Sequence, residues 1–402
     1  MVNSIFANGG VSVFEAMSRL AGEHRAVNLG QGFPEGLEPP AVIEAAIKAL
    51  RDGPHQYPPM LGLPALRQAA ADNARRFHGF DVDWEREVVV TAGATEGLAA
   101  TFLGLLEPGD EAIVFEPVYD SYAVMLRRAG ARPVPVRLKP PRWELPREEL
   151  KAAIGARTRA IVVNTPMNPI GKIFSDDELR FIASLLLDHG LVAIADEVYE
   201  HLTFDGRKHN SLFAHPEVRD RVVRVSSASK SFSVTGWRVG YVFADAKLLA
   251  PISRAHQFIT FAIPPALQTA VAFGLGLPDA YFAGLRTALQ QRRNLLIDGL
   301  REAEFAAADA EAAYFTLVDI SDLDADGDDV AFARRMTVEA GVTAVPVSAF
   351  YGGGELRSHI RFCFAKNDET LVEALKRLEA WRGRAERERV PHAIHRHGGL
   401  DR

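Results

Sequence analysis

One lysine lies between two strand-like runs of this sequence, in a segment made largely of small and hydroxyl-bearing residues. The apolar run 222–225 predicts a buried strand, and the run 237–243, rich in β-branched and aromatic residues, predicts another. Lys230 stands between them with serines on both sides, and Arg238 follows eight positions later. A desolvated lysine can offer a neutral amine to a carbonyl group, while hydroxyls and a guanidinium suit a phosphate. Taken alone, the same residues also fit an exposed lysine in a serine-rich loop.

The segment 227–240 resembles the lysine signature of class I and II aminotransferases, enzymes that depend on pyridoxal 5'-phosphate. The restricted positions of that signature are matched by Ser227, Ala228, Ser229, Lys230, Ser233, Val234, Gly236, Arg238, Val239 and Gly240. The resemblance covers about residues 12–378 and is nearest to the kynurenine/glutamine/methionine aminotransferase branch. It implies that Lys230 holds the cofactor covalently and that Ser227 and Arg238 bind its phosphate.

A further candidate phosphate contact lies where an expected strand, 88–91, passes through a turn of small residues into a helix expected over 98–106. Free backbone amides and the positive end of the helix dipole favour anions at such a junction. The resemblance assigns Ala94 and Thr95 to the cofactor phosphate. Many turns in α/β proteins share this pattern, so a plain turn is the alternative.

An apolar run, 191–195, predicts a strand that ends in Asp196, and Tyr199 follows three residues later. A pyridine ring acts as an electron sink when its nitrogen is protonated and paired with a carboxylate. An aspartate after a strand is otherwise often a helix cap. The resemblance assigns Asp196 to the ring nitrogen, and Tyr199 and Asn168 to the phenolic oxygen. The order of these residues along the chain matches that of the family.

Four further residues receive roles through the resemblance. Tyr119, which follows an expected strand, would stack on the cofactor ring. Arg361 would bind the substrate α-carboxylate with its forked guanidinium, Asn168 would also bind the substrate, and Gly32 would approach the carboxylate through its backbone amide. Tyr57 would reach across a dimer interface to the phosphate bound by a partner subunit. Without the resemblance, core packing, a tight turn or a surface arginine would explain these residues.

Strands and helices alternate along most of the chain, which predicts an α/β fold. The resemblance implies the fold type I architecture, with a large domain built on a mostly parallel, seven-stranded sheet and a smaller α+β domain. We expect an N-terminal arm with part of the small domain in residues 1–40, the large cofactor-binding domain in 41–285, the small C-terminal domain in 286–381, and a disordered tail in 382–402. Ser175 and Glu178 predict a capping box for a helix over 176–189. A strand is expected over 313–320.

The net charge, the hydropathy and the single cysteine of the sequence argue against several kinds of partner and cross-link. A net charge of −6 over 402 residues argues against nucleic acid. No apolar stretch is long enough to span a bilayer. Cys363 is the only cysteine, which rules out an internal disulfide and fits the reducing cytoplasm. The acidic stretch 322–329 lacks the final glutamate of a calcium loop, and we expect no metal.

We therefore expect a cytoplasmic homodimer with shared active sites, whose other partners are an L-amino acid and a 2-oxo acid. The amino donor would carry a neutral, sulfur-containing or aromatic side chain, as in methionine, glutamine or phenylalanine. Lys230 would move the α-proton as general base and acid. Thr95 and Ala262 stand where kynurenine-type relatives carry aromatic or histidine residues, which argues against a kynurenine preference.

Related activities remain open at the level of the sequence. A C–S β-lyase acting on cysteine conjugates or cystathionine would use the same cofactor and lysine. A succinyldiaminopimelate aminotransferase belongs to the same branch. No arginine stands out as a clamp for a second substrate carboxylate, although Arg254 and Arg286 are candidates. A non-catalytic regulator built on this fold would need an added DNA-binding domain.

Overall fold

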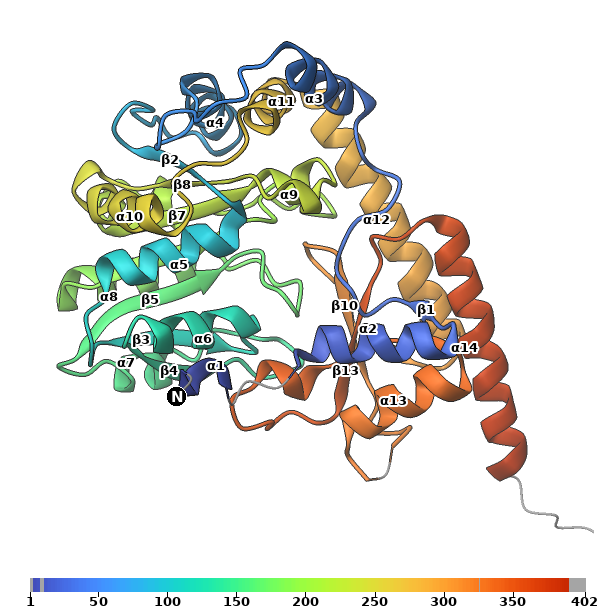
Figure 1. The fold of residues 1–402 in the computed structure, drawn as a ribbon. Helices are drawn as coiled ribbons and strands as arrows, with labels where there is room; N and C mark the ends of the chain where they lie inside the picture. The colour runs from blue at the N-terminus through green and yellow to red at the C-terminus, as the bar shows by residue number, and fades with distance from the viewer. Residues whose placement is uncertain (1–2, 8–10, 325, 390–402) are drawn as a thin grey trace, which may run out of the picture.

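A seven-stranded sheet organises the larger part of the molecule (Figure 1). Its order is β2-β8-β7-β6-β5-β3-β4, and each neighbouring pair is parallel except the two that involve β8. The strands are β2 (Val88–Thr91), β3 (Glu111–Glu116), β4 (Arg132–Arg137), β5 (Thr158–Asn164), β6 (Val192–Asp196), β7 (Val222–Ser227) and β8 (Gly240–Phe243). The computed structural model describes residues 3–7, 11–324 and 326–389 of the chain.

Helices cover both faces of this sheet, which explains why its central strands read as continuous apolar runs. On one face the core includes Leu98, Leu126 and Ile252, and on the other it includes Leu66 and Leu179. The first face is covered by α5 (Gly93–Leu105), α6 (Asp120–Arg128) and α10 (Ala246–Ile259). The second is covered by α3 (Pro40–Asp52), α4 (Pro64–His78), α8 (Asp176–His189) and α11 (Pro265–Leu275).

A second, smaller core forms around a four-stranded antiparallel sheet of order β12-β13-β10-β9. Met17 and Leu29 from the N-terminal part join residues from 285 onward in this core. Its strands are β9 (Ala306–Ala307), β10 (Phe315–Asp319), β12 (Val345–Pro346) and β13 (His359–Cys363), and beside them β1 (Val27–Asn28) pairs with β11 (Val342–Thr343). Its helices are α2 (Val13–His24), α13 (Asp329–Glu339) and α14 (Asp368–Arg389), while the long α12 (Asp279–Glu302) runs between the two parts (Figure 1). The predicted α/β class, with a large mostly parallel sheet and a smaller α+β part, is confirmed.

Several predicted boundaries are wrong for local reasons. The helix expected from residue 98 begins at Gly93, so the small-residue turn is its first turn. The strand expected over 237–243 begins only at Gly240, because Arg238 is left-handed with φ 55° and breaks the extended backbone. Likewise Ala313, with φ 64°, delays β10 to Phe315. The capping box of α8 forms as predicted between Ser175 and Glu178.

The prediction of a disordered tail over residues 382–402 is wrong for the first part of that range. Helix α14 continues to Arg389, so residues 382–389 are helical rather than disordered. Arg384 donates to the Glu339 carbonyl at 3.3 Å and Arg382 to Glu304 at 3.4 Å, which ties the extension to the small core. The rest of the expected tail, 390–402, lies outside the described residues.

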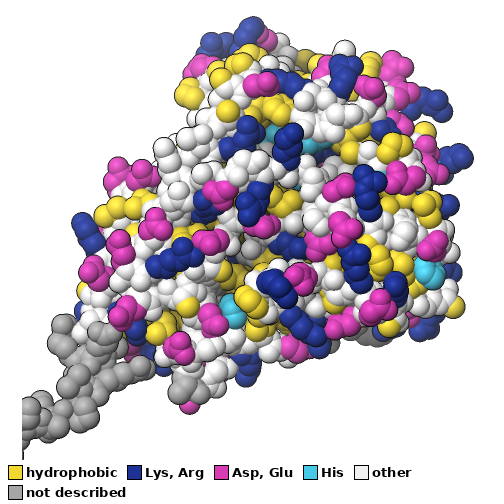
Figure 2. All heavy atoms as spheres, turned by 180° about the vertical axis from the view of Figure 1, so that it is seen from behind, with side chains coloured by type: hydrophobic (Ala, Val, Ile, Leu, Met, Phe, Trp, Pro, Cys, Tyr) yellow, Lys and Arg dark blue, Asp and Glu magenta, His cyan; other side chains and the backbone are white. Residues whose placement is uncertain are grey.

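The surface carries charges of both signs. Figure 2 shows basic and acidic side chains interspersed over the face seen from behind. Within the described residues, no helix combines the length and the apolar character needed to cross a membrane.

Candidate active site

The carboxyl ends of β5, β6 and β7 face a pocket of about 330 Å³ that also receives side chains from the small core. Binding sites in open α/β sheets form at this edge. The predicted residues that line it are Gly32, Ala94, Thr95, Tyr119, Asn168, Asp196, Tyr199, Ser227, Lys230, Arg238 and Arg361. Residues far apart in sequence therefore meet around one cavity. Tyr57, also predicted, lies outside it.

Lys230 lies on α9 (Ala228–Ser231), a single turn that follows β7 directly. Ser227 caps this turn by accepting a hydrogen bond from the Ser229 amide at 3.1 Å, and its hydroxyl donates to the Val239 carbonyl at 3.2 Å. Burial lowers the pKa of the Lys230 amine to about 8. Within the described part of the chain no carboxylate pairs with this amine, and its nitrogen lies 5.8 Å from the ring centre of Tyr199. The amine is therefore poised to lose its proton near neutral pH.

Asp196 ends β6 and is almost completely buried. Its Oδ2 accepts a hydrogen bond from the Tyr122 phenol, and its Oδ1 accepts a 3.4 Å bond from the Val198 amide. Burial raises the pKa of Asp196 to about 6 despite these donors. Sequence reasoning missed Tyr122, which also lines the pocket. It stands three residues after Tyr119, the N-cap residue of α6, and this spacing by itself does not distinguish it from a core tyrosine.

Arg361 lies in β13 with its guanidinium buried and held by neutral acceptors. Nη1 donates to Asn168 Oδ1 and Nη2 to the Gly30 carbonyl, both at 2.7 Å, while Nε has no hydrogen-bond partner among the residues that the structure describes. The guanidinium carbon lies 4.0 Å from the ring centre of Phe315 and 5.1 Å from that of Phe14. Burial lowers the pKa of Arg361 to about 10. A desolvated cation with a spare donor favours binding of an anion here.

The first turn of α5 packs directly against Arg238. Gly93 has φ 76°, and a Cβ added there would lie 2.5 Å from Arg238 Nη2. Gly240 is equally close to this turn, because a Cβ added to Gly240 would lie 2.5 Å from the Gly93 carbonyl carbon. The hydroxyl of Ser229, nearby in sequence, is buried and has no hydrogen-bond partner in the described part of the chain. Backbone amides at a helix start, a guanidinium and a free hydroxyl make a site for an anion.

Tyr57 is 85% exposed, and its ring packs edge-on against Phe261 with centroids 5.4 Å apart. Phe258, on α10, is also 85% exposed. Large aromatic side chains that are this exposed are uncommon on a surface that faces only water.

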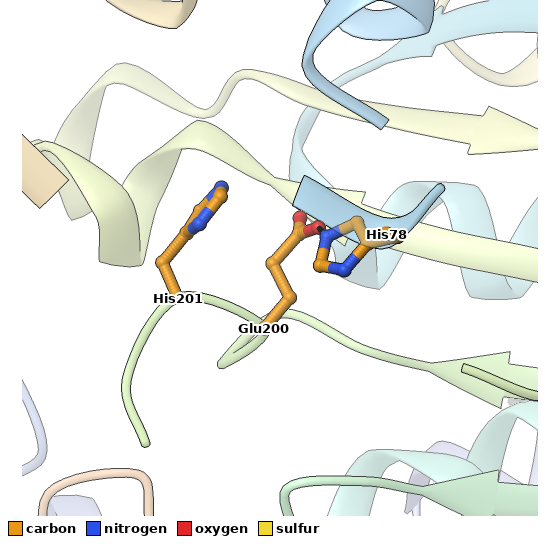
Figure 3. Close-up of side chains that lie close together, drawn as sticks. All are labelled: His78, Glu200 and His201. Atoms are coloured by element: carbon orange, nitrogen blue, oxygen red, sulfur yellow. Dashed lines mark hydrogen bonds and ion pairs between the residues drawn. The ribbon is translucent and has the colours of Figure 1, made fainter. Parts of the chain in front are cut away.

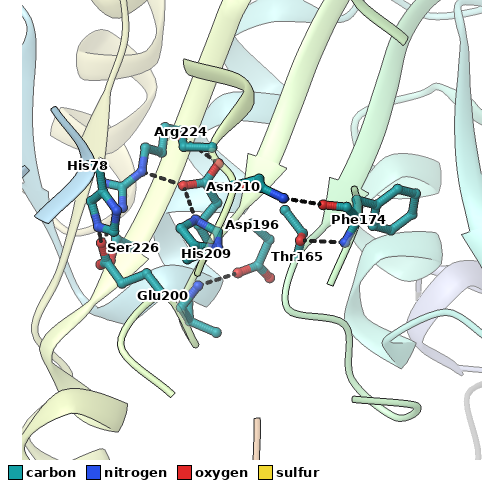
Figure 4. Close-up of polar contacts among 12 residues, drawn as sticks. His78, Thr165, Phe174, Asp196, Glu200, His209, Asn210, Arg224 and Ser226 are labelled. Carbon is teal, nitrogen blue, oxygen red and sulfur yellow. Dashed lines mark hydrogen bonds and ion pairs between the residues drawn. The ribbon is translucent and has the colours of Figure 1, made fainter. Parts of the chain in front are cut away.

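Behind the pocket, Arg224 on β7 pairs with two buried glutamates of the segment that follows β6 (Figure 4). Its Nε donates to Glu197 and its Nη2 to Glu200. His209 bonds the same oxygen of Glu197 at 2.9 Å, and Ser226 donates to Glu200. Because Tyr199 lies between the two glutamates, this network fixes the segment that carries it.

Three of the nearby side chains, His78, Glu200 and His201, have ligand atoms within 4.8 Å of one another. Figure 3 shows the His78 ring against the Glu200 carboxylate and the His201 ring apart from both. Glu200 already accepts from His78, Arg224 and Ser226, while His201 Nε2 lies 3.2 Å from Asn73 Oδ1. The Arg224 guanidinium would repel a cation bound to the same carboxylate. We therefore interpret the cluster as a structural ion-pair network.

Comparisons with known proteins agree with this geometry. Residues 24–378 match the family described as "Aminotransferase class I and II". A probable N-succinyldiaminopimelate aminotransferase of Mycobacterium tuberculosis is 42% identical over 378 residues, covering 91% of this chain and 95% of the relative. The methionine aminotransferase of Escherichia coli is 38% identical over 369 residues, covering 92% and 95%.

Among solved structures, YbdL from Escherichia coli, described with a methionine aminotransferase function, superposes with a TM-score of 0.91. It is 37% identical, and the match covers 94% of this chain and 99% of that one. The family predicted from the lysine signature is thus confirmed. The chain belongs to the class I and II aminotransferases, enzymes of the fold type I architecture that transfer an amino group from an amino acid to a 2-oxo acid.

Proposed function

We propose that the protein is a pyridoxal 5'-phosphate-dependent aminotransferase for L-amino acids with neutral, sulfur-containing or aromatic side chains. One observation carries the proposal: three charged groups line the same pocket. They are the desolvated amine of Lys230, the buried carboxylate of Asp196, and the guanidinium of Arg361, which pairs with no carboxylate among the described residues. The lone buried thiol, Cys363, favours action in the cytoplasm.

The residues of the pocket fit this cofactor. Its phosphate would receive hydrogen bonds from the amides of Ala94 and Thr95 and from Ser227 and Arg238, and the hydroxyl of Ser229 would add a further donor. The ring would lie against Tyr119, with its nitrogen towards Asp196. When bound, pyridoxal phosphate supplies the electron sink that stabilises negative charge at the substrate Cα.

Lys230 would handle the proton. With a pKa of about 8, an appreciable fraction of its amine is neutral at physiological pH once the substrate has taken its place on the cofactor. The amine would then remove the proton from Cα and deliver it to the adjacent carbon of the cofactor. The rings of Tyr199 and Tyr314, whose centres lie 5.8 and 5.5 Å from the lysine nitrogen, help to keep water away.

Arg361 would bind the α-carboxylate of the substrate. Asn168 and the Gly30 carbonyl hold its guanidinium in place, and the rings of Phe14 and Phe315 cover it. This arrangement would hold the substrate by its α-carboxylate in the pocket that Lys230 also lines. Water exclusion by the aromatic rings strengthens the carboxylate contact.

The pocket composition bears on the side chain of the substrate. Among the described residues that line it, the cations are Lys230, Arg238 and Arg361, and each already has a role above. Phe14 and Leu98 contribute apolar surface. These features favour a neutral side chain. The relative described as an N-succinyldiaminopimelate aminotransferase, at 42% identity, makes a long acylated substrate the second candidate.

We also propose that a second copy of the chain covers the aromatic surface of Tyr57, Phe258 and Phe261. Burial of exposed aromatic rings is a strong contribution to subunit association. Sedimentation equilibrium should give a dimer, and Phe258→Ser should weaken it. A monomer with full activity would exclude the shared site.

The assignment is tested by adding single L-amino acids, without acceptor, to the purified protein loaded with pyridoxal phosphate. Loss of the visible band and rise of the aminated cofactor's near-ultraviolet band with methionine, glutamine or phenylalanine supports transamination. N-succinyldiaminopimelate in the same assay tests the second candidate. Pyruvate release from cysteine conjugates without any acceptor would instead identify a β-lyase. Lys230→Ala should keep the fold and lose turnover, and near-normal activity in that variant contradicts the proposal.

A further inference from the structure

The phenol of Tyr122 is a buried polar group at the pocket, and it takes no part in the binding or proton transfer proposed for the other residues. Tyr122 lies on α6 and is 3% exposed, and its hydroxyl donates to Asp196 Oδ2. Its ring packs edge-on against that of Tyr119, with centroids 5.6 Å apart. Tyr119, the N-cap residue of α6, thus places an aromatic ring at the pocket, and the first turn of the helix carries the donor that holds the carboxylate.

Only one oxygen of Asp196 is firmly held. Within the described residues, Oδ2 accepts from the Tyr122 phenol, whereas Oδ1 has only the 3.4 Å bond from the Val198 amide. A phenol hydrogen bonds more strongly to a carboxylate than to a protonated carboxyl group, so the contact favours the ionised form. Oδ1 is left for a ligand in the pocket.

We propose that Tyr122 is a positioning residue that keeps Asp196 ionised and holds it with Oδ1 available to the ring nitrogen of the cofactor. This inference rests on the proposed function, because it needs pyridoxal phosphate in the pocket. Tyr122 itself does not touch the reacting atoms in this scheme. It acts through Asp196.

The charges around Asp196 support this assignment. Burial raises the pKa of Asp196, and the Tyr122 hydrogen bond is the largest of the influences that lower it, ahead of the Val198 amide and the charge of Lys230. Glu197 acts in the opposite sense, but it is paired with Arg224. The titratable groups that face Asp196 are Tyr119, Tyr122, Glu197, Tyr199 and Lys230. The three tyrosines stay neutral because burial raises the pKa of each.

The experiment measures binding of pyridoxal phosphate to the cofactor-free full-length protein as a function of pH, for the wild type and for Tyr122→Phe. Removing the donor raises the pKa of Asp196, so the loss of affinity on the acid side should begin about one pH unit higher in the variant. At pH 5, below the pKa of Asp196 in both proteins, we expect about tenfold weaker binding by the variant, and at pH 7 about twofold. Tyr281→Phe is the matched control, because it also removes one phenol hydroxyl. That hydroxyl is partly buried and donates to the Ser231 carbonyl at 2.7 Å, and it does not contact Asp196.

A second readout isolates the ring nitrogen. The same titrations are made with 1-deazapyridoxal phosphate, in which a CH group replaces that nitrogen. If Tyr122 acts through Asp196 and the ring nitrogen, Tyr122→Phe should bind this analogue almost as tightly as the wild type. The remaining loss of affinity should be no larger than that of Tyr281→Phe. An equal deficit with both cofactors shows a merely structural role and overturns the inference.

The outcomes separate the two proposals. A wild-type protein that binds no pyridoxal phosphate at any pH overturns the proposed function, and this inference with it. A wild type that binds normally and a Tyr122→Phe variant with the same pH profile overturn the inference alone. Circular dichroism of the variant establishes that it is folded before it is compared.

Discussion

Arg361 Nη1 and Asn168 Oδ1 are hydrogen-bonded at 2.7 Å across 193 positions of sequence. Asn168 follows the end of β5 in the large sheet, and Arg361 belongs to β13 in the small core. The bond therefore joins the two parts of the molecule at the pocket. A carboxylate that binds Arg361 is therefore positioned by residues of both parts at once.

Arg361→Lys should weaken substrate binding far more than it slows turnover. Lysine keeps a positive charge but cannot donate to Asn168 and the Gly30 carbonyl while also gripping a carboxylate. We expect KM for the preferred amino acid to rise about 100-fold, with a smaller change in kcat. Steady-state kinetics measure both. Arg180→Lys, on α8 with a side chain that is 63% exposed, is the control and should change neither.

Gly93→Ala should impair the anion cradle at the start of α5. The new Cβ would lie 2.5 Å from Arg238 Nη2 and push the guanidinium aside. Affinity for pyridoxal phosphate should fall at least tenfold, from loss of one charge-assisted hydrogen bond. Gly109→Ala separates this clash from backbone strain, because Gly109 also has positive φ, 96°, but no described atom lies within 4 Å of a Cβ added there. Equal affinity losses in the two variants would contradict the argument.

Sequence alone located much of the site, because polar residues that directly follow parallel strands must meet at one edge of the sheet. Asp196 and Ser227 end β6 and β7, and both line the pocket. Tyr122 could not be found in this way, since a tyrosine at helical spacing is indistinguishable from a core residue until its partner is known. Arg224 was hidden for a related reason: it lies within an apolar strand, and the carboxylates that pair with it come from another segment.

The helix start at Gly93 and the left-handed Arg238 were equally out of reach. Both depend on the contact between the first turn of α5 and the Arg238 side chain, which is a tertiary contact. Local propensity predicted a loop in the first case and a strand in the second. The resemblance to the family supplied the residue roles, but it carried no information on these backbone conformations.

Arg224→Met should destabilise the protein by about 3–5 kcal/mol, because it leaves Glu197 and Glu200 buried without their cation. Chemical unfolding monitored by circular dichroism measures the change. Lys48→Met is the control, since it breaks an ion pair whose side chains are 77% and 52% exposed, and it should cost less than about 0.5 kcal/mol. A loss as small as that of the control would show that the network contributes little.

The contribution of Glu197 and Glu200 to the unfolding free energy should depend on pH in opposite directions in the wild type and in Arg224→Met. In the wild type, burial opposes ionisation of Glu200, but the charge of Arg224 and the His78 hydrogen bond hold its pKa well below the usual range. A lowered pKa stabilises the fold above the unfolded value of about 4.3, and this contribution is lost as pH falls below it. In Arg224→Met, burial dominates and raises both glutamate pKa values. The unfolding free energy of the variant should therefore increase from pH 7 to pH 5, while that of the wild type should not.

Lys230 should react with pyridoxal phosphate at a lower pH than other lysines of the cofactor-free protein. Its amine has a pKa of about 8 because it is buried, so its neutral fraction falls as pH drops through 8, whereas an exposed lysine titrates near about 10.4. Borohydride trapping at pH 7 followed by peptide mass spectrometry should place the label on Lys230, and the initial rate should rise with a midpoint near pH 8. Lys48, which is 77% exposed, is the internal reference. Equal labelling of the two lysines at pH 7 would mean that the pocket does not lower the pKa of the Lys230 amine, and the proposed proton transfer would lose its base.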